Sequence, residues 1–249
     1  MELTGKQALI SGGVKGIGKE VVLLLLEAGV SVGVLDNDSS GLEKLKAELP
    51  DISTYDCDIS DYSNVEKSVD TFFKSAGKID ILINNAGILF NRPLVQFNAL
   101  GIEKHDPAEW QKVIDVNLNG PFYLASCVAA KMLEKRTRGV IVNISSISAA
   151  GNKGQSAYSA AKAGLNALTA TWAKELGVMR IRVVGVAPGY SDTDSTHSIL
   201  NEEILKELKT EIPLRRLGKP QEIAKGILSV IENDFFNGKV LQLDGGMVV

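Results

Sequence analysis

The sequence has few cysteines and few histidines, and this limits the chemistry it can carry. Its two cysteines, Cys57 and Cys127, lie far apart in the chain, which argues against a disulfide framework and against a zinc site. The two histidines, His105 and His197, add no metal-ligand spacing. We therefore expect no bound metal.

Long apolar runs and an excess of charge of one sign are also missing. The stretch from Val21 to Val30 contains Glu27 and is shorter than the roughly 20 residues that a membrane-spanning helix needs. The N-terminus lacks the pattern of a secretory signal, and a net charge of −3 provides no basic field for nucleic acid. We expect a cytoplasmic protein without a membrane or nucleic-acid partner.

Hydrophobic residues make up 45% of the 249 residues, and short apolar runs alternate with longer amphipathic segments. The runs predict strands at 7–10, 31–35, 79–83, 140–144, 182–187 and 240–243. The segments predict helices at 19–27, 41–48, 65–76, 108–133, 157–176 and 221–231. Because the strands are continuously apolar, they suit a parallel sheet with both faces covered. We predict one α/β domain over residues 1–249, a doubly wound parallel sheet of the Rossmann type.

Two segments do not fit this alternation. Residues 88–106 show no clear period, and residues 190–211 open with Ser, Thr and Asp before a helix-like stretch. Both follow the carboxyl ends of predicted strands, where ligands bind in open α/β sheets. We expect both segments to form walls or lids of a cleft.

A glycine-rich loop, SGGVKGIG at 11–18, joins the first strand to the first helix. Glycines at 12, 16 and 18 allow a tight turn and a close approach of a pyrophosphate to the main chain. The helix N-terminus supplies free N–H groups to the phosphates. Such a loop also occurs for structural reasons alone, so the dinucleotide interpretation needs further support.

That support comes from the end of the second strand. Asp36 lies about twenty residues beyond the loop, where a carboxylate accepts hydrogen bonds from an adenosine ribose. A carboxylate there repels a 2′-phosphate, which favours NAD over NADP, whereas Lys15 within the loop would compensate such a phosphate. Asp58, followed by Ile59 after an apparent third strand, is either an acceptor for the adenine amino group or an ordinary turn aspartate.

Tyr158 and Lys162 are four residues apart on a predicted helix and therefore share a face. A free phenol has a pKa near 10 and is a poor base at neutral pH. A nearby ammonium and a cationic nicotinamide ring both favour the phenolate. Tyr158 is thus a candidate acid and base for a substrate oxygen.

Polar residues at strand ends surround this pair in the predicted fold. Ser145 and Ser146 end the strand at 140–144, and the block Asn84 to Gly87 ends another. Asn117 is a polar residue in an otherwise apolar helix and is a candidate to hold a water for proton relay. Each could be a satisfied structural group, but their joint position at strand ends favours one site.

Together these features resemble the short-chain dehydrogenase/reductase family over essentially the whole chain. The resemblance also rests on Pro188-Gly189 with Thr193, and on Asp244-Gly245-Gly246 near the C-terminus. It implies a seven-stranded Rossmann fold and a dimer or tetramer. It also implies that Lys162 holds the nicotinamide ribose and that the segment after Pro188-Gly189 contacts the carboxamide.

The expected catalytic residues are Asn117, Ser146, Tyr158 and Lys162. The expected dinucleotide contacts are Gly12, Lys15, Gly16, Ile17, Gly18, Asp36, Asp58, Ile59, Asn85, Ala86, Gly87, Tyr158, Lys162, Pro188, Gly189 and Thr193. The expected coenzyme is NAD, with NADP as the alternative.

The chain departs from the family pattern in two places. Counting from the strand identifies Ser146 as the active serine, and counting back from Tyr158 identifies Ser145. We choose Ser146, since a deletion is easier in the following loop than inside a buried strand. The stretch from Gly87 to Trp110 is longer than the family usually has, which makes it unsafe to transfer a substrate from relatives.

The closest general resemblance is to 3-oxoacyl-(acyl-carrier-protein) reductases and to sugar-alcohol or glucose dehydrogenases. Lys131 and Lys174 stand where the first group carries basic residues that meet the acidic carrier, although lone surface lysines are usually just solvated. Asp36 favours the second group, because it favours NAD and the 3-oxoacyl-(acyl-carrier-protein) reductases mostly use NADPH. A catalytically silent dinucleotide sensor is a third reading, which the presence of both Tyr158 and Lys162 disfavours. The expected substrate is an alcohol, a ketone or an acyl thioester, with an acyl carrier protein as a further partner.

Overall fold

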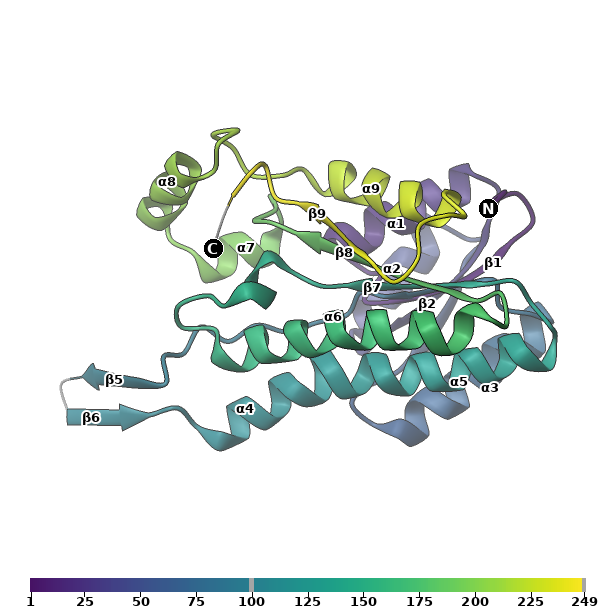
Figure 1. The fold of residues 1–249 in the computed structure, drawn as a ribbon, viewed down its shortest axis with the longest axis horizontal. Helices are drawn as coiled ribbons and strands as arrows, with labels where there is room; N and C mark the ends of the chain where they lie inside the picture. The colour runs from purple at the N-terminus through teal and green to yellow at the C-terminus, as the bar shows by residue number, and fades with distance from the viewer. Residues whose placement is uncertain (99–100, 248–249) are drawn as a thin grey trace.

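The computed structural model describes residues 1–98 and 101–247, and its centre is one parallel sheet (Figure 1). Seven strands pair in the order β3-β2-β1-β4-β7-β8-β9. The strands are β1 Gln7–Ser11, β2 Ser31–Asp36, β3 Ser53–Asp56, β4 Ile81–Asn84, β7 Val140–Ile144, β8 Arg182–Pro188 and β9 Val240–Leu243. The chain switches direction across the sheet between β1 and β4, and a crevice at such a point is where open α/β sheets bind ligands. The predicted doubly wound parallel sheet is confirmed.

Helices cover both faces of the sheet (Figure 1). One apolar layer joins the sheet to α1, α2 and α9, and a second joins it to α3, α5 and α6. These helices are α1 Gly16–Glu27, α2 Ser39–Glu48, α3 Tyr62–Ala76, α5 Gly120–Glu134, α6 Ser156–Gly177 and α9 Pro220–Glu232. Strand residues alternate between the layers, as the period of a strand requires. In β1, Ile10 faces the first layer and Leu9 faces the second.

The predicted helix over 108–133 is interrupted in the structure. It consists of α4 Pro107–Ile114, a π-helical turn Asp115–Asn119 and α5. A π-helical turn inserts one residue into the helical repeat and is often found at functional sites. Periodicity cannot detect such a turn, because the apolar pattern continues on both sides of it.

The segment at 88–106, for which the sequence predicted no element, contains an antiparallel hairpin. Its strands, β5 Val95–Asn98 and β6 Gly101–Lys104, extend away from the body of the molecule (Figure 1). Phe97 and Ile102 face each other in register and are 84% and 69% exposed. The base of the hairpin, in contrast, is anchored, because Arg92 N donates to Gly154 O at 2.7 Å. The base therefore borders the loop that leads into α6.

The segment after β8 forms two short helices, α7 Asp194–Ile199 and α8 Glu202–Glu211. They lie at the same end of the molecule as the hairpin (Figure 1). A small apolar cluster of its own holds α8 in place, formed by Leu205, Leu208, Ile212 and Leu217. Within residues 1–98 and 101–247, no helix is long and apolar enough to cross a membrane.

Candidate active site

Tyr158 and Lys162 lie in the first two turns of α6, with their polar groups at the carboxyl edge of the sheet. Lys162 is 3% exposed, and its ammonium donates to Ile144 O, at the end of β7, at 2.8 Å. Its Nζ lies 5.5 Å from the centre of the Tyr158 ring. The structure thus brings the phenol and the ammonium together, as the spacing of four predicted.

Burial acts on both groups and shifts both toward their neutral forms. It raises the pKa of Tyr158 above its usual 10, while a hydrogen bond with Ser146 acts in the opposite direction and the nearby Tyr190 adds a small increase. Burial lowers the pKa of Lys162 to about 8. The protein alone therefore does not yet provide a phenolate at neutral pH, and a positive charge brought beside Tyr158 would favour it.

The two candidate serines have different environments. Ser146 lies close enough to Tyr158 to lower the pKa of its phenol, and its Oγ accepts from Ser148 N at 3.1 Å. Ser145 is 3% exposed, and its Oγ donates to Lys162 O at 3.4 Å. Ser146 is therefore the serine that lies next to the phenol, whereas Ser145 contacts the backbone of α6.

Asn117 lies in the π-helical turn, where its side chain replaces missing backbone contacts. Its Nδ2 donates to Ile88 O at 2.8 Å and to Val113 O at 3.0 Å. Its Oδ1 is buried and has no hydrogen-bond partner in the described part of the chain. A buried acceptor of this kind needs a donor, and the water for proton relay predicted from the sequence would supply one.

Gly87 lies beside this acceptor. A Cβ at position 87 would come within 2.6 Å of Asn117 Oδ1 and 3.7 Å of Lys162 Nζ. The end of β4, the π-helical turn and α6 therefore meet at one point, as the sequence analysis expected.

The glycine-rich loop is packed too tightly for a side chain at position 18. A Cβ there would lie 2.0 Å from Gly12 O. The Asn85 side chain holds the loop at the same place, donating to Gly12 O at 2.7 Å and to Ser11 O at 3.1 Å. Ser11 Oγ in turn accepts from the backbone N–H groups of Asn85 and Ala86, both at 3.2 Å.

The N-terminus of α1 is open to an anion. Its N-cap residue is Lys15, and in the described structure no side chain caps the helix, although the first N–H groups of a helix need acceptors. These N–H groups belong to Gly16, Ile17 and Gly18. Thr193 approaches from beyond β8, with its Cγ2 3.6 Å from where a Cβ of Gly16 would stand. A bare helix N-terminus behind a tight glycine turn fits a dinucleotide pyrophosphate.

Acidic residues lie at or just after the ends of β2 and β3, where the sequence predicts that the adenosine of a dinucleotide would bind. Asp36 accepts from Asp38 N at 3.2 Å and from Val14 N at 3.4 Å, and burial raises the pKa of its carboxyl. Asp58 accepts from the backbone and hydroxyl of Ser60 at 2.9 and 2.7 Å, as a turn aspartate does. Ile59 is 5% exposed, and its side chain belongs to the apolar layer that contains α3, α5 and α6.

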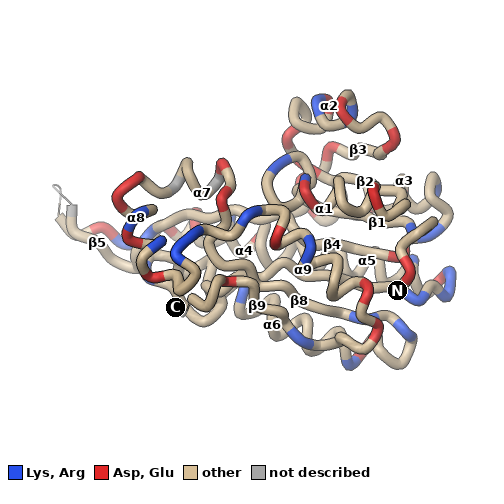
Figure 2. The backbone as a smooth tube through the Cα atoms, turned by 90° about the horizontal axis from the view of Figure 1, so that it is seen from above, with Lys and Arg blue, Asp and Glu red and all other residues tan. Residues whose placement is uncertain are grey.

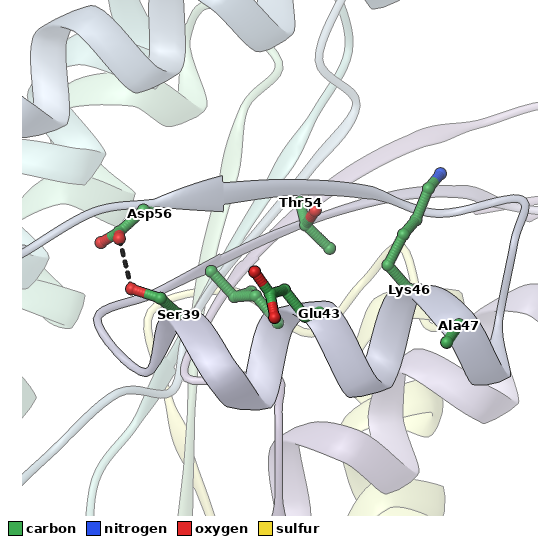
Figure 3. Close-up of a pocket in the computed structure, with 7 residues that line it drawn as sticks. Ser39, Glu43, Lys46, Ala47, Thr54 and Asp56 are labelled. Atoms are coloured by element: carbon green, nitrogen blue, oxygen red, sulfur yellow. Dashed lines mark hydrogen bonds between the residues drawn. The ribbon is translucent and has the colours of Figure 1, made fainter.

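A separate cavity of about 560 Å³ lies between α2 and β3 (Figure 3). Ser39 and Asp56 at one end of it form a hydrogen bond of 2.5 Å. Asp56 is also the register partner of Asp36. This contact fixes the start of α2 beside the adenosine end, and none of the predicted site residues lines the cavity.

The end of β8 forms the opposite wall of the site. Gly189 N donates to Leu243 O at 2.9 Å, and Thr193 caps α7 by accepting from Thr196 N at 3.3 Å. Sequence reasoning missed two residues here, Tyr190 and Asn152, whose side chains are 3.0 Å apart. The signal available was the position of Tyr190, directly after Pro188-Gly189.

Of the two lysines considered for a carrier protein, one is already paired. Lys131 Nζ lies 2.8 Å from Asp70 and 5.1 Å from the centre of the Phe73 ring. Lys174 is exposed on α6. Of these two, Lys174 is the one without an ion pair in the described part of the chain.

Comparisons with known proteins agree with this geometry. The family model described as short chain dehydrogenase matches residues 6–204. A 3-oxoacyl-[acyl-carrier-protein] reductase from Thermotoga maritima is 38% identical and is aligned over all of both chains. One from Chlamydia pneumoniae is 36% identical over 98% of both chains. The crystal structure of a short-chain type dehydrogenase/reductase from Mycobacterium marinum superposes with a TM-score of 0.89 at 30% identity, covering 98% of this chain and 96% of the other. The chain belongs to the short-chain dehydrogenase family and, as an oxidoreductase that uses NAD or NADP, resembles its 3-oxoacyl-[acyl-carrier-protein] reductases.

Proposed function

We propose that the chain reduces a 3-oxoacyl thioester to the corresponding secondary alcohol with NADH. The observation that carries the chemistry is the position of Ser146 beside the Tyr158 phenol, with the buried ammonium of Lys162 5.5 Å from the centre of the same ring. The names of the full-length relatives support the substrate class.

In this mechanism the substrate carbonyl oxygen lies between Tyr158 and Ser146. A bound nicotinamide dinucleotide supplies the hydride. Ser146 donates a hydrogen bond that orients and polarises the carbonyl, and Tyr158 donates the proton that the oxygen gains. Lys162 stabilises the resulting phenolate by its charge. The open Oδ1 of Asn117 binds a water that, by way of Lys162, returns a proton to the Tyr158 phenolate.

Charge at the adenosine end supports NADH as the coenzyme. Four carboxylates end or follow β2 and β3: Asp36 and Asp56 are the last residues of the two strands, and Asp38 and Asp58 come two residues later. Acidic positions appear beside β3 in Figure 2. A 2′-phosphate here would have to lie among like charges, at a cost that grows as water is excluded. Lys15 is the one basic residue of the glycine-rich loop.

A second candidate function is oxidation of a sugar, polyol or other secondary alcohol with NAD. The same carboxylates favour it, because an NAD-linked enzyme commonly works in the direction of oxidation. The extended segment around the hairpin changes the rim of the cleft relative to the family pattern, and it leaves room for a different substrate.

Acyl carrier protein is the proposed donor of the thioester. An acidic carrier would be attracted to Lys174, whereas Lys131 contributes less because Asp70 neutralises it. We also propose a homodimer or homotetramer. Exposed large apolar side chains on and beyond α5 and α6 suit such contacts, namely Phe122, Leu133, Val178 and Met179.

Titration of the purified protein with NADH and NADPH, followed by turnover assays, tests these proposals. We expect tighter binding of NADH, and turnover of 3-oxoacyl thioesters above that of sugars and simple secondary alcohols. NADPH binding at least tenfold tighter would contradict the coenzyme assignment. Turnover of polyols alone would replace the first function with the second.

A further inference from the structure

Tyr190 and Asn152 connect the segment after β8 to the loop before α6 at the candidate site. Tyr190 directly follows the Pro188-Gly189 turn at the end of β8, and Asn152 lies in the loop before α6. Asn152 Nδ2 donates to the phenol oxygen of Tyr190 at 3.0 Å. The hydroxyl of Tyr190 is therefore held in position from the side of the catalytic loop.

The same pair is linked to the catalytic serine. Asn152 Nδ2 also lies 3.4 Å from Ser148 Oγ, and Ser148 N donates to Ser146 Oγ. Tyr190 lies close enough to Tyr158 to influence its ionisation. Ser146 and Tyr190 therefore both lie near Tyr158.

The hydroxyl of Tyr190 has a proton to donate. A phenol can accept and donate at the same time, and here it accepts from Asn152. Within residues 1–98 and 101–247, the structure shows no acceptor for the Tyr190 proton. Since Tyr190 is only half-buried, this donor is available to a ligand in the cleft.

The ring of Tyr190 is fixed on its other side. It packs against the apolar cluster of α8 that contains Leu205 and Leu208. A ring held by a cluster and a hydroxyl held by an amide lose little conformational freedom when a ligand binds, which favours affinity.

We propose that Tyr190, positioned by Asn152, binds a second oxygen of the substrate, one that does not react. This inference rests on the proposed function, in which Tyr158 and Ser146 take the reacting oxygen. A 3-oxoacyl thioester has such an oxygen, the thioester carbonyl two carbons from the ketone. The Tyr190 hydroxyl donates to it, so the pair selects substrates with two oxygens in a 1,3 relationship over simple ketones.

The test compares two substrates and two variants. Values of kcat and KM are measured with NADH for a 3-oxoacyl thioester and for a monoketone of similar length. Tyr190→Phe keeps the ring and removes the donor, and it should lower the preference for the thioester about tenfold, mainly through KM, as expected for one lost hydrogen bond. Asn152→Ala should change the preference in the same direction by a smaller factor.

Tyr123→Phe is the matched control, because Tyr123 is half-buried on α5 and packs edge-on against Tyr62. It should leave the preference unchanged. Equal effects of Tyr190→Phe on both substrates, or no effect on either, would overturn the inference, as would a wild-type protein with no preference for the second oxygen. If the wild type reduces other ketones but no 3-oxoacyl thioester, the proposed function fails. In that case the preference for a 1,3-diketone over a monoketone is measured in the wild type and in Tyr190→Phe, and its loss in the variant would still support the role of Tyr190.

Discussion

Lys162 donates a hydrogen bond from its buried ammonium to the carbonyl oxygen of Ile144, the last residue of β7, at 2.8 Å. A carbonyl is a neutral partner, so it compensates only part of the hydration that the ammonium loses on burial. This explains why burial lowers the pKa of Lys162 to about 8. Keeping the Lys162 ammonium charged beside Tyr158 therefore lowers the free energy of unfolding.

That cost predicts how the stability of the protein without coenzyme depends on pH. Between pH 8 and 10.5 the unfolded chain keeps the Lys162 proton that the folded chain has lost, so stability rises with pH in this window. Relative to Lys162→Met, the wild-type free energy of unfolding should increase by about 1.5 kcal/mol from pH 8 to pH 9.5. Urea denaturation at a series of pH values measures this difference.

The matched control for that experiment is Lys174→Met, an exposed lysine on the same helix. It should show the same pH dependence as the wild type. A constant difference between wild type and Lys162→Met across the window would mean that the Lys162 pKa is not depressed.

Removing the Tyr158 hydroxyl should abolish turnover without abolishing coenzyme binding. Tyr158→Phe loses the group that transfers the proton, which is worth roughly 10²–10⁴ in kcat. The glycine-rich loop does not depend on Tyr158, so the dissociation constant for NADH should change less than threefold. Steady-state kinetics and fluorescence titration give the two values. Turnover retained at the wild-type rate in this variant would mean that Tyr158 is not the proton donor.

The two serines should respond differently to removal of their hydroxyls. Ser146→Ala deletes the partner of Tyr158 and should lower kcat by about 10–100-fold, as for the loss of a hydrogen bond made in the transition state. Ser145→Ala deletes a long hydrogen bond to the backbone of α6 and should change kcat by less than about threefold. The opposite order would make Ser145 the active serine.

Much of the fold was predictable because strands and helices leave strong periodic signals. Continuous apolar runs predicted six of the seven strands. The seventh, β3, gave only a weak signal, because Ser53–Asp56 is short and half-buried. The π-helical turn around Asn117 was not predictable, since it adds a residue without breaking the apolar pattern. The hairpin was not predicted from the sequence, because the apolar residues of its strands face solvent instead of a core.

The site was predictable to the extent that its residues lie in a motif or at a strand end. The glycine-rich loop met both conditions, and the Tyr158 pair met the first through its spacing of four on one helix. The link between Asn152 and Tyr190 joins residues 38 positions apart, and neither residue belongs to a periodic element. Only the folded chain shows that they are partners.

The carboxylate of Asp36 should determine the choice of coenzyme. Asp36→Ala removes an acceptor for the adenosine ribose, and the loss of charged hydrogen bonds should weaken NADH binding by about 10–100-fold. NADPH binding should become stronger, because repulsion of the 2′-phosphate falls. Calorimetric titration of both coenzymes measures the ratio, with Asp51→Ala, an exposed carboxylate outside the site, as the control. An unchanged ratio of the NADH and NADPH dissociation constants would mean that Lys15, and not Asp36, determines the choice of coenzyme.

Gly18 tests whether close packing of the glycine-rich loop is required for dinucleotide binding. In Gly18→Ala the new methyl group would stand 2.0 Å from Gly12 O and 2.6 Å from Asn85 Nδ2, so the loop must shift at a cost of about 1–3 kcal/mol. Coenzyme binding should fall below detection by calorimetry, while circular dichroism still shows a folded protein. Gly177→Ala is the matched control. The nearest atom to its methyl group would be Asn237 Nδ2 at 3.6 Å, an ordinary contact, so coenzyme affinity should stay at the wild-type value. Equal affinities in the two variants would show that the loop tolerates a side chain and that the pyrophosphate is bound elsewhere.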